Sequence, residues 1–133
     1  MLVCGMLDPG PADVGADRGL IADAVHALFD CAQICTACAG SCLGQEQLAL
    51  LRTCIRTALD CADLCEATAR ALSRRLGYDA DLTRAQLRAC IEICFRCAEE
   101  CERHASEHEH CRVCAEDCRR CAASCLALLT AFG

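Results

Sequence analysis

Residues 111–125 read CRVCAEDCRRCAASC, and the spacing of the five cysteines in this stretch decides the fold. Successive cysteines are separated by steps of 3, 4, 3 and 4 residues, which is the period of one face of an α-helix. At about 100° per residue, such steps keep the side chains within an arc of roughly 60°. The stretch therefore predicts a helix that carries a stripe of thiols where leucine usually packs.

Three other segments repeat this pattern, two with cysteine steps of 4, 3 and 4 and one with steps of 7 and 4. The four segments together contain Cys31, Cys35, Cys38, Cys42, Cys54, Cys61, Cys65, Cys90, Cys94, Cys97, Cys101, Cys111, Cys114, Cys118, Cys121 and Cys125. We predict helices at about residues 17–43, 45–76, 81–106 and 108–131, the third beginning at Asp81 or Thr83 as its N-cap. Residues 1–16 hold both prolines and are expected to form a flexible tail.

Four long helices with short connections predict an all-α fold, an antiparallel up-and-down four-helix bundle with a cysteine-lined core over residues 17–133. In this arrangement the apolar ends of the four helices meet at one end of the bundle. The residues that we expect there are Ile21, Leu28, Leu72, Leu87, Leu128 and Phe132. The opposite end receives the first and third connections, and with them His104, His108 and His110.

The composition narrows the classes of function. A net charge of −6 gives no reason to expect nucleic-acid binding. The sequence shows no secretory signal and no uninterrupted apolar run of about 18 residues, so we expect neither export nor a membrane partner. In the reducing cytosol that this implies, an array of cysteines usually serves metal binding rather than disulfides. We therefore expect a cytoplasmic metal-binding protein.

The number of inward cysteines favours metal over packing. A buried cysteine often acts as a small hydrophobic residue. Sixteen of them in register would displace nearly all the leucine and isoleucine from half of the core, which is a poor way to pack a bundle. We therefore predict that these thiols are metal ligands.

The identity of the metal follows from charge. Soft thiolates select Cu(I), Zn(II) or iron–sulfur clusters. Four-thiolate zinc and iron–sulfur sites are anionic, and the thiol faces offer no basic residue to offset a buried charge. One Cu(I) per thiolate gives a neutral core instead. We predict multiple Cu(I) ions, about one per bundle cysteine, in a bundle that is already folded without metal because neutral thiols are reasonably apolar.

Two histidines extend the cysteine face of the third helix. His104 follows Cys101 by three residues, and His108 follows His104 by four. Neutral imidazole binds copper, so we predict that both relay Cu(I) into the bundle. His110 is a weaker candidate, and His26 lies off the cysteine face and is expected on the surface.

The cysteine stripes resemble those of the bacterial copper storage proteins, which are cysteine-lined four-helix bundles that hold many Cu(I) ions. The resemblance covers nearly the whole chain beyond the tail. It implies a cytosolic member, a homotetramer, and copper uptake through the polar end of the bundle. A second apolar stripe on the second helix, at Leu48, Leu51, Ile55, Leu59 and Ala62, would suit such an assembly. We expect a store that protects against copper toxicity, supplies copper enzymes, and receives copper from a chaperone donor.

Three other functions stay open. A general thiol buffer for divalent soft metals such as zinc or cadmium would use the same residues. A disulfide-bonded helical hairpin would need an oxidising compartment and paired motifs that do not stand out here. An enzyme would need a low-pKa thiol beside a base in a cleft, and Cys101 with His104 would leave the other fifteen thiols unexplained. We therefore predict that the protein is not an enzyme.

Overall fold

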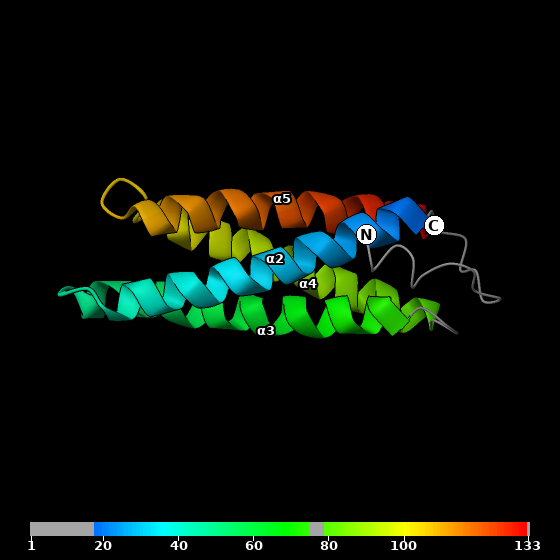
Figure 1. Cartoon of the computed structure of the whole chain (residues 1–133), viewed down its shortest axis with the longest axis horizontal. Coiled ribbons are helices and arrows are strands. Elements are labelled where there is room, and N and C mark those ends of the chain that lie inside the picture. The colour runs from blue at the N-terminus through cyan, green and yellow to red at the C-terminus, as the bar shows by residue number, and fades with distance from the viewer. Residues whose placement is uncertain (1–17, 75–78, 133) are drawn as a thin grey trace.

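The computed structural model describes residues 18–74 and 79–132, which form a bundle of four long α-helices (Figure 1). The helices are α2 (Arg18–Leu43), α3 (Arg52–Arg74), α4 (Ala80–Glu102) and α5 (Glu109–Ala131), and a short 3₁₀ helix, η1 (Leu48–Leu51), precedes α3. The all-α, up-and-down fold expected from the cysteine spacing is confirmed. The expected tail at residues 1–16, with its Cys4, lies outside the described residues.

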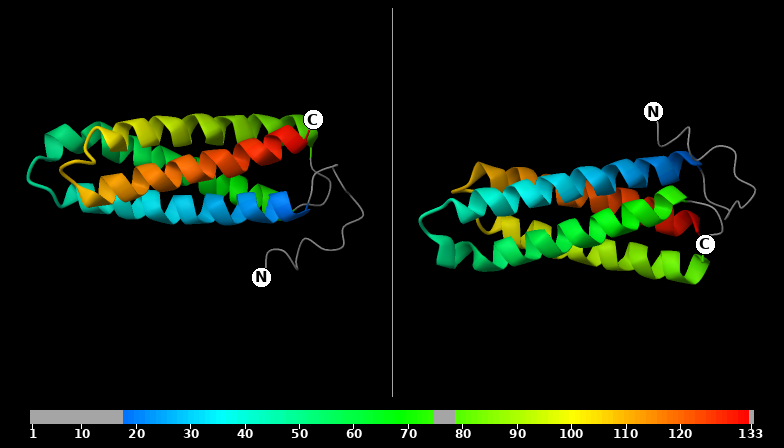
Figure 2. Two further views of the ribbon diagram at one scale, coloured as in Figure 1. Left: turned by 90° about the horizontal axis from the view of Figure 1, so that it is seen from above. Right: turned by 60° about the horizontal axis from the view of Figure 1, so that its bottom comes forward.

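The four helices are arranged as a square in cross-section. Helix α2 packs against α3 and α5, and α4 packs against the same two helices from the other side (Figure 2). Each helix therefore presents one face to the centre, where the thiols lie, and its opposite face to the outside. The buried residues that fill the spaces between neighbouring helices are mostly alanines, including Ala32, Ala62, Ala98 and Ala122, which allow close approach of the backbones.

The two ends of the bundle differ in character. The α2–α3 and α4–α5 connections lie together at one end, which we call the connection end (Figure 1). The beginning of α2, the beginning of α4 and the end of α5 lie at the other, which we call the apolar end. At the apolar end the core is hydrocarbon, as the sequence predicted. The residues buried there are Ile21, Leu28, Leu72, Leu87, Leu128 and Phe132.

The start of the second long helix differs from the prediction. The sequence predicts a helix from residue 45, but α3 begins at Arg52, after a turn and the 3₁₀ helix η1. The turn is held by bonds from the Gln45 backbone N–H to the Cys42 carbonyl and from the Gln45 side chain to the Ser41 carbonyl. The chain reverses in the turn at residues 44–47, and the more tightly wound η1 that follows buries Leu51, whose exposed fraction is 1%. The spacing of apolar residues continues without a break from η1 into α3. The sequence pattern alone therefore places the start of the α-helix too early.

The boundaries of α4 and α5 also differ from the prediction. Asp79, rather than Asp81 or Thr83, is the N-cap of α4, and its carboxylate accepts a hydrogen bond from the Leu82 backbone N–H at 3.1 Å. Helix α4 ends at Glu102 instead of residue 106, because the chain tightens into turns in which the His104 N–H bonds to the Cys101 carbonyl. His108 has an extended backbone and precedes the first residue of α5.

By length and composition, α2 is the one described helix that is long and apolar enough to cross a membrane, although its sequence contains no uninterrupted apolar run of that length. Half of its most apolar window is buried within the bundle. Alanines and cysteines that face α3, α5 and the central thiols supply that apolarity. The same composition is therefore accounted for by the core position of this helix.

Candidate metal centre

All sixteen cysteines from Cys31 to Cys125 are buried with exposed fractions of 2% or less, and all of them are free thiols. The structure therefore brings together every cysteine that the sequence analysis assigned to the core. They reach the centre because the steps of three and four residues keep each set on the inner face of its helix.

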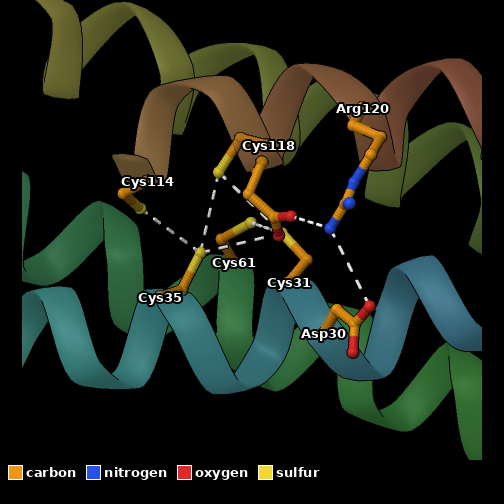
Figure 3. A network of polar contacts seen from close by, with 8 residues as sticks. Asp30, Cys31, Cys35, Cys61, Cys114, Cys118 and Arg120 are labelled. Carbon is orange, nitrogen blue, oxygen red and sulfur yellow. Dashed lines mark hydrogen bonds and ion pairs between the residues drawn. The ribbon is translucent and has the colours of Figure 1, made fainter. Parts of the chain in front are cut away.

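Thiols of α2 and α5 contact one another across the bundle. The Sγ atom of Cys35 lies 3.6 Å from that of Cys118 and 3.8 Å from that of Cys114. The Sγ atoms of Cys31 and Cys118 are 3.8 Å apart, and Cys31 also lies 3.9 Å from Cys61 of α3 (Figure 3). These distances are contacts between separate sulfur atoms, well beyond the length of a disulfide bond of about 2.05 Å.

Thiols of α3 and α4 also contact one another. The Sγ atom of Cys94 on α4 lies 3.7 Å from that of Cys65 and 3.8 Å from that of Cys61, both on α3. Nearer the connection end, Cys54 and Cys101 are 3.6 Å apart. Since Cys61 also contacts Cys31, the sulfur atoms of all four helices belong to one network.

This network resolves into five groups of three or four thiols, within each of which the sulfur atoms lie within 4.8 Å of one another. In order from the connection end, the groups are Cys38/Cys42/Cys54/Cys111, Cys38/Cys101/Cys114, Cys35/Cys97/Cys114/Cys118, Cys31/Cys35/Cys61/Cys118 and Cys31/Cys65/Cys94/Cys121. Each group shares at least one cysteine with the next. The five groups therefore form an unbroken thiol column along the bundle axis.

The column carries no cation from the protein. The buried polar or charged residues among those described are three threonines and one aspartate, with no lysine, arginine or histidine. Burial away from water raises the pKa of Cys42 to about 11 and raises the pKa of Cys111 as well, because a thiolate loses its hydration there. Without metal, Cys42 and Cys111 therefore stay protonated and neutral at physiological pH.

His110, which the sequence analysis ranked below His104 and His108, is the histidine in contact with the column. Its Nε2 atom lies 3.3 Å from the Sγ atom of Cys42, a member of the outermost group. Burial and the neighbouring His108 ring lower the pKa of His110, so its ring is neutral at physiological pH and has a lone pair for a metal. The position was readable from the sequence, since His110 precedes Cys114 by four residues and so continues its face.

The other two histidines at this end have different partners. The His108 ring lies 5.3 Å from the His110 ring, measured between centroids. His104 instead has its Nε2 atom 3.1 Å from a carboxylate oxygen of Glu100, and both side chains are largely buried. All three histidines therefore lie at the connection end, but the His104 ring contacts the Glu100 carboxylate.

The expectation that His26 lies on the surface is wrong. Its side chain is half-buried near the apolar end of α2, and its Nε2 atom is buried without a hydrogen-bond partner among the described residues. Its place between Val25 and Ala27, both buried, puts it at the edge of the core rather than on the exposed face of α2.

Asp117 is a polar residue beside the column that the sequence analysis did not identify. Its exposed fraction is 6%, one carboxylate oxygen accepts a hydrogen bond from Arg120, and the other has no partner among the described residues. Arg120 also lies 3.8 Å from Asp30, so the two helices α5 and α2 are joined there (Figure 3). Burial raises the pKa of Asp117 to about 6. In the sequence it stands among charged neighbours and reads as part of a solvated face.

Hollows in the surface lie away from the thiols. Grooves of about 540 and 740 Å³ run between α3 and α4 and between α4 and α5, and their linings contain no cysteine. The thiols thus lie in the packed interior of the bundle and line neither of these two grooves.

Comparison with known proteins agrees with this geometry. Residues 18–130 match the family model described as "copper storage protein". No curated protein matches the chain.

Several solved structures are similar to this one. A structure of the copper storage protein Ccsp from Streptomyces lividans, loaded with 10 copper equivalents, has 53% sequence identity and a TM-score of 0.92, covering 96% of this chain and 98% of that one. A second, described as copper loading to a cytosolic copper storage protein from Streptomyces lividans with five coppers, has 54% identity and a TM-score of 0.84, covering 85% and 94%. The Cu(I)-bound copper storage protein BsCsp3 has 30% identity and a TM-score of 0.70, covering 79% and 93%.

Proposed function

Because this chain belongs to the copper storage protein family, we propose that it stores Cu(I) as thiolate-bound ions along the bundle axis. The observation that carries this proposal is the unbroken thiol column, in which each group shares a cysteine with its neighbour. A shared thiolate can bridge two ions, so the column can fill as one continuous array rather than as separate sites.

The charge of the column favours Cu(I) over divalent metals. A zinc ion held by four thiolates leaves a site with a charge of −2, and five overlapping groups of this kind would bury a large negative charge. No described cation lies in the core to offset it. One Cu(I) per thiolate leaves no net charge, which is why we propose a capacity of about one ion per bundle cysteine, the sixteen cysteines being the ligands.

We propose that copper enters the column at the connection end. The contact between His110 and Cys42 joins an imidazole to the outermost thiol group, and His108 lies beside His110. His104 and His108 remain proposed copper ligands, as predicted from the sequence, and His110 joins them on the basis of its contact. For His104, the hydrogen bond to Glu100 means that Cu(I) would compete with the carboxylate or use the other ring nitrogen.

The cellular role that we propose is cytosolic. The similar Streptomyces lividans structure is described as that of a cytosolic copper storage protein, which supports this location. Sequestration of Cu(I) would protect the cell from copper toxicity and provide a supply for copper enzymes, and a copper chaperone is the proposed donor. We propose no catalytic reaction, since the family is one of storage proteins and the thiols lie in a packed core.

We further propose that the protein assembles as a homotetramer. Exposed apolar side chains on the outside of the bundle support this, including Leu48 and Leu59 near and on α3, which are 41% and 43% exposed. Leu51 and Ala62, which the sequence analysis placed on the same stripe, do not contribute, because both are buried within the chain. Native mass spectrometry of the metal-free protein should give four times the chain mass, and a monomer at micromolar concentration would reject this proposal.

Titration of the reduced, metal-free protein with Cu(I) under anaerobic conditions tests the storage proposal. We expect sulfur-to-copper charge-transfer absorption to rise to a stoichiometry near one ion per bundle cysteine and to persist against a strong Cu(I) chelator. A parallel titration with zinc is the control. Saturation at a few copper ions, together with tighter binding of zinc or cadmium, would favour a general buffer for divalent metals instead.

A further inference from the structure

The thiol column stops short of the apolar end, and two buried cysteines lie outside all five groups. They are Cys90 of α4 and Cys125 of α5, both with exposed fractions of 0%. Cys90 precedes Cys94 by four residues and therefore lies one helical turn beyond the last group on the same face of α4. A thiol at the end of a bridged array has neighbouring ligands on one side only.

Cys90 has a polar partner in this position. Its Sγ atom lies 3.0 Å from the Oγ1 atom of Thr68 on α3, and 3.4 Å from the Leu64 backbone carbonyl oxygen. Thr68 is itself 2% exposed and follows Cys65 by three residues, so it occupies a place on the cysteine face of α3. The metal-free thiol of Cys90 is thus a donor that points at a hydroxyl oxygen inside the core.

The partner of the Thr68 hydroxyl differs in kind from the partners of two other threonine hydroxyls on the bundle helices. The hydroxyl groups of Thr36 and Thr57 donate to backbone carbonyls one turn earlier, to Ala32 at 2.8 Å and to Thr53 at 2.7 Å. Such bonds satisfy the hydroxyl within its own helix and have no bearing on the column. The Thr68 hydroxyl instead joins α3 to a thiol of α4.

A hydroxyl suits both states of the thiol. It has one donor hydrogen and two acceptor lone pairs, and its hydrogen rotates to suit the partner. While Cys90 is protonated, Thr68 accepts its S–H hydrogen. When Cu(I) replaces that hydrogen, the proton leaves for solvent, a Cu–S bond forms, and the sulfur becomes an acceptor to which the Thr68 O–H can donate.

We propose that Thr68 is a positioning residue that holds Cys90 as the terminal thiolate of the copper array. This inference rests on the proposed storage function. A thiolate in the middle of the column can share its charge between two Cu(I) ions. A thiolate at the end binds fewer ions and keeps more negative charge, next to a hydrocarbon core that includes Leu72 and Leu87 and offers no counter-ion. The hydroxyl of Thr68 offsets that charge, and the neighbouring Cys65 and Cys94 supply the other ligands of the innermost ion.

The test compares three variants of the full chain in the anaerobic Cu(I) titration with chelator competition. Thr68→Val keeps the shape and removes the hydroxyl, Thr68→Ser restores a hydroxyl, and Thr57→Val is the control for the loss of a buried hydroxyl on α3. We expect Thr68→Val to lower the affinity of about one ion by on the order of tenfold, with the others unchanged. Thr68→Ser and Thr57→Val should titrate like the wild type.

A double-mutant cycle separates positioning from a general structural role. Cys90→Ser removes the terminal thiol, so adding Thr68→Val to Cys90→Ser should change copper binding no further. In the metal-free protein, Thr68→Val should shift an S–H stretching band in the infrared spectrum that Cys90→Ser abolishes. Thermal unfolding of each metal-free variant verifies that it is folded.

The outcomes distinguish this inference from the storage function. If the wild type fills to many ions and Thr68→Val matches it, the positioning role of Thr68 is wrong and the store stands. An effect of Thr68→Val that persists in the Cys90→Ser background would also overturn it. A wild type that binds only a few ions would instead reject the proposed function itself.

Discussion

At the scale of single residues, Asp117 is the one buried carboxylate in the part of the chain that the structure describes, and it is the sequence neighbour of Cys118 of the thiol column. Water is excluded from it on nearly all sides, one oxygen has no partner among the described residues, and the single cation in contact is Arg120. A buried carboxylate of this kind favours its neutral form, which explains why its pKa is raised to about 6 from an ordinary value of 3.8. Its protonation state is thereby linked to folding.

We predict that Asp117→Asn flattens the pH dependence of the stability of the metal-free protein. Between pH 4 and 6 the folded state holds the Asp117 proton and the unfolded state releases it. The free energy of unfolding of the wild type therefore falls as pH rises through this range, by up to roughly 3 kcal/mol. Below this range both states are protonated, and above it neither is, so the change is confined there.

Denaturant unfolding of reduced protein at several pH values measures this effect. Asp30→Asn is the matched control, because Asp30 contacts the same Arg120 but is 57% exposed. Equal slopes for the wild type and Asp117→Asn between pH 4 and 6 would show that Asp117 does not titrate as its burial requires.

His110 is the residue at which we expect copper uptake to be limited. Its Nε2 atom is 3.3 Å from the outermost thiol of the column, so an ion bound there has a ligand within reach. We predict that His110→Ala slows the early phase of Cu(I) uptake from a chelate donor several-fold and leaves the final number of ions unchanged. Stopped-flow absorption in the charge-transfer band measures both quantities.

The control for this prediction is His26→Ala. His26 and Cys42 are on the same helix, about 24 Å apart along its axis, so loss of His26 should leave the uptake rate unaltered. Equal slowing in both variants would mean that the effect is structural, and no slowing in His110→Ala would place the uptake route elsewhere.

At the scale of helices, the face of each element was predictable and its ends were not. The cysteine steps assign an inner face because a period of about 3.6 residues is followed by three or more cysteines in each helix. The end of a helix depends on one or two local bonds instead. Asp79 caps α4 from outside the periodic pattern, and η1 prolongs the apolar period of α3 with a different winding. Neither feature changes the spacing from which the helices were read.

The N-cap of α4 gives a prediction at this scale. The Asp79 carboxylate satisfies a backbone N–H that would otherwise lack a partner, so Asp79→Ala should destabilise the metal-free protein by about 1 kcal/mol. Asp81→Ala, in the first turn of the same helix, removes a side chain that is 95% exposed together with its ion pair to Arg84, and should cost only a few tenths of a kcal/mol. Chemical denaturation compares the two, and a larger loss for Asp81→Ala would contradict the assigned cap.

The candidate site was predictable in part for similar reasons. The sixteen thiols were predicted to be metal ligands because so many cysteines at helical spacing are hard to explain in another way. His110 precedes Cys114 by four residues and so lies on the same helix face. It also directly precedes Cys111, and this second relation by itself does not place it on that face. Asp117 was not recoverable from the pattern, because nothing in a run of charged residues shows which of them the neighbouring helix α2 covers. The hydrogen bond of Cys90 to Thr68 likewise requires the pairing of α3 with α4.

At the scale of the whole molecule, the bundle is a column of thiols closed by hydrocarbon at one end and bordered by histidines at the other. Antiparallel connectivity produces this difference, because it brings two connections and three histidines to the same end. No lysine, arginine or histidine among the described residues is buried in the core, and protonated thiols are reasonably apolar, so we expect the bundle to fold without metal. With the proposed entry at the connection end, we expect filling to run from there toward Thr68 and Cys90.

The central claim is that copper ions occupy the interior of the bundle along this column. The measurement that tests it most directly is a crystal structure of the copper-loaded protein with anomalous data collected at the copper absorption edge. We predict a line of copper peaks along the axis, each bonded to sulfur, from the group of Cys42 and Cys111 to that of Cys65 and Cys121. Copper peaks confined to the histidines or to the outer surface, with the thiol column empty, would contradict the account.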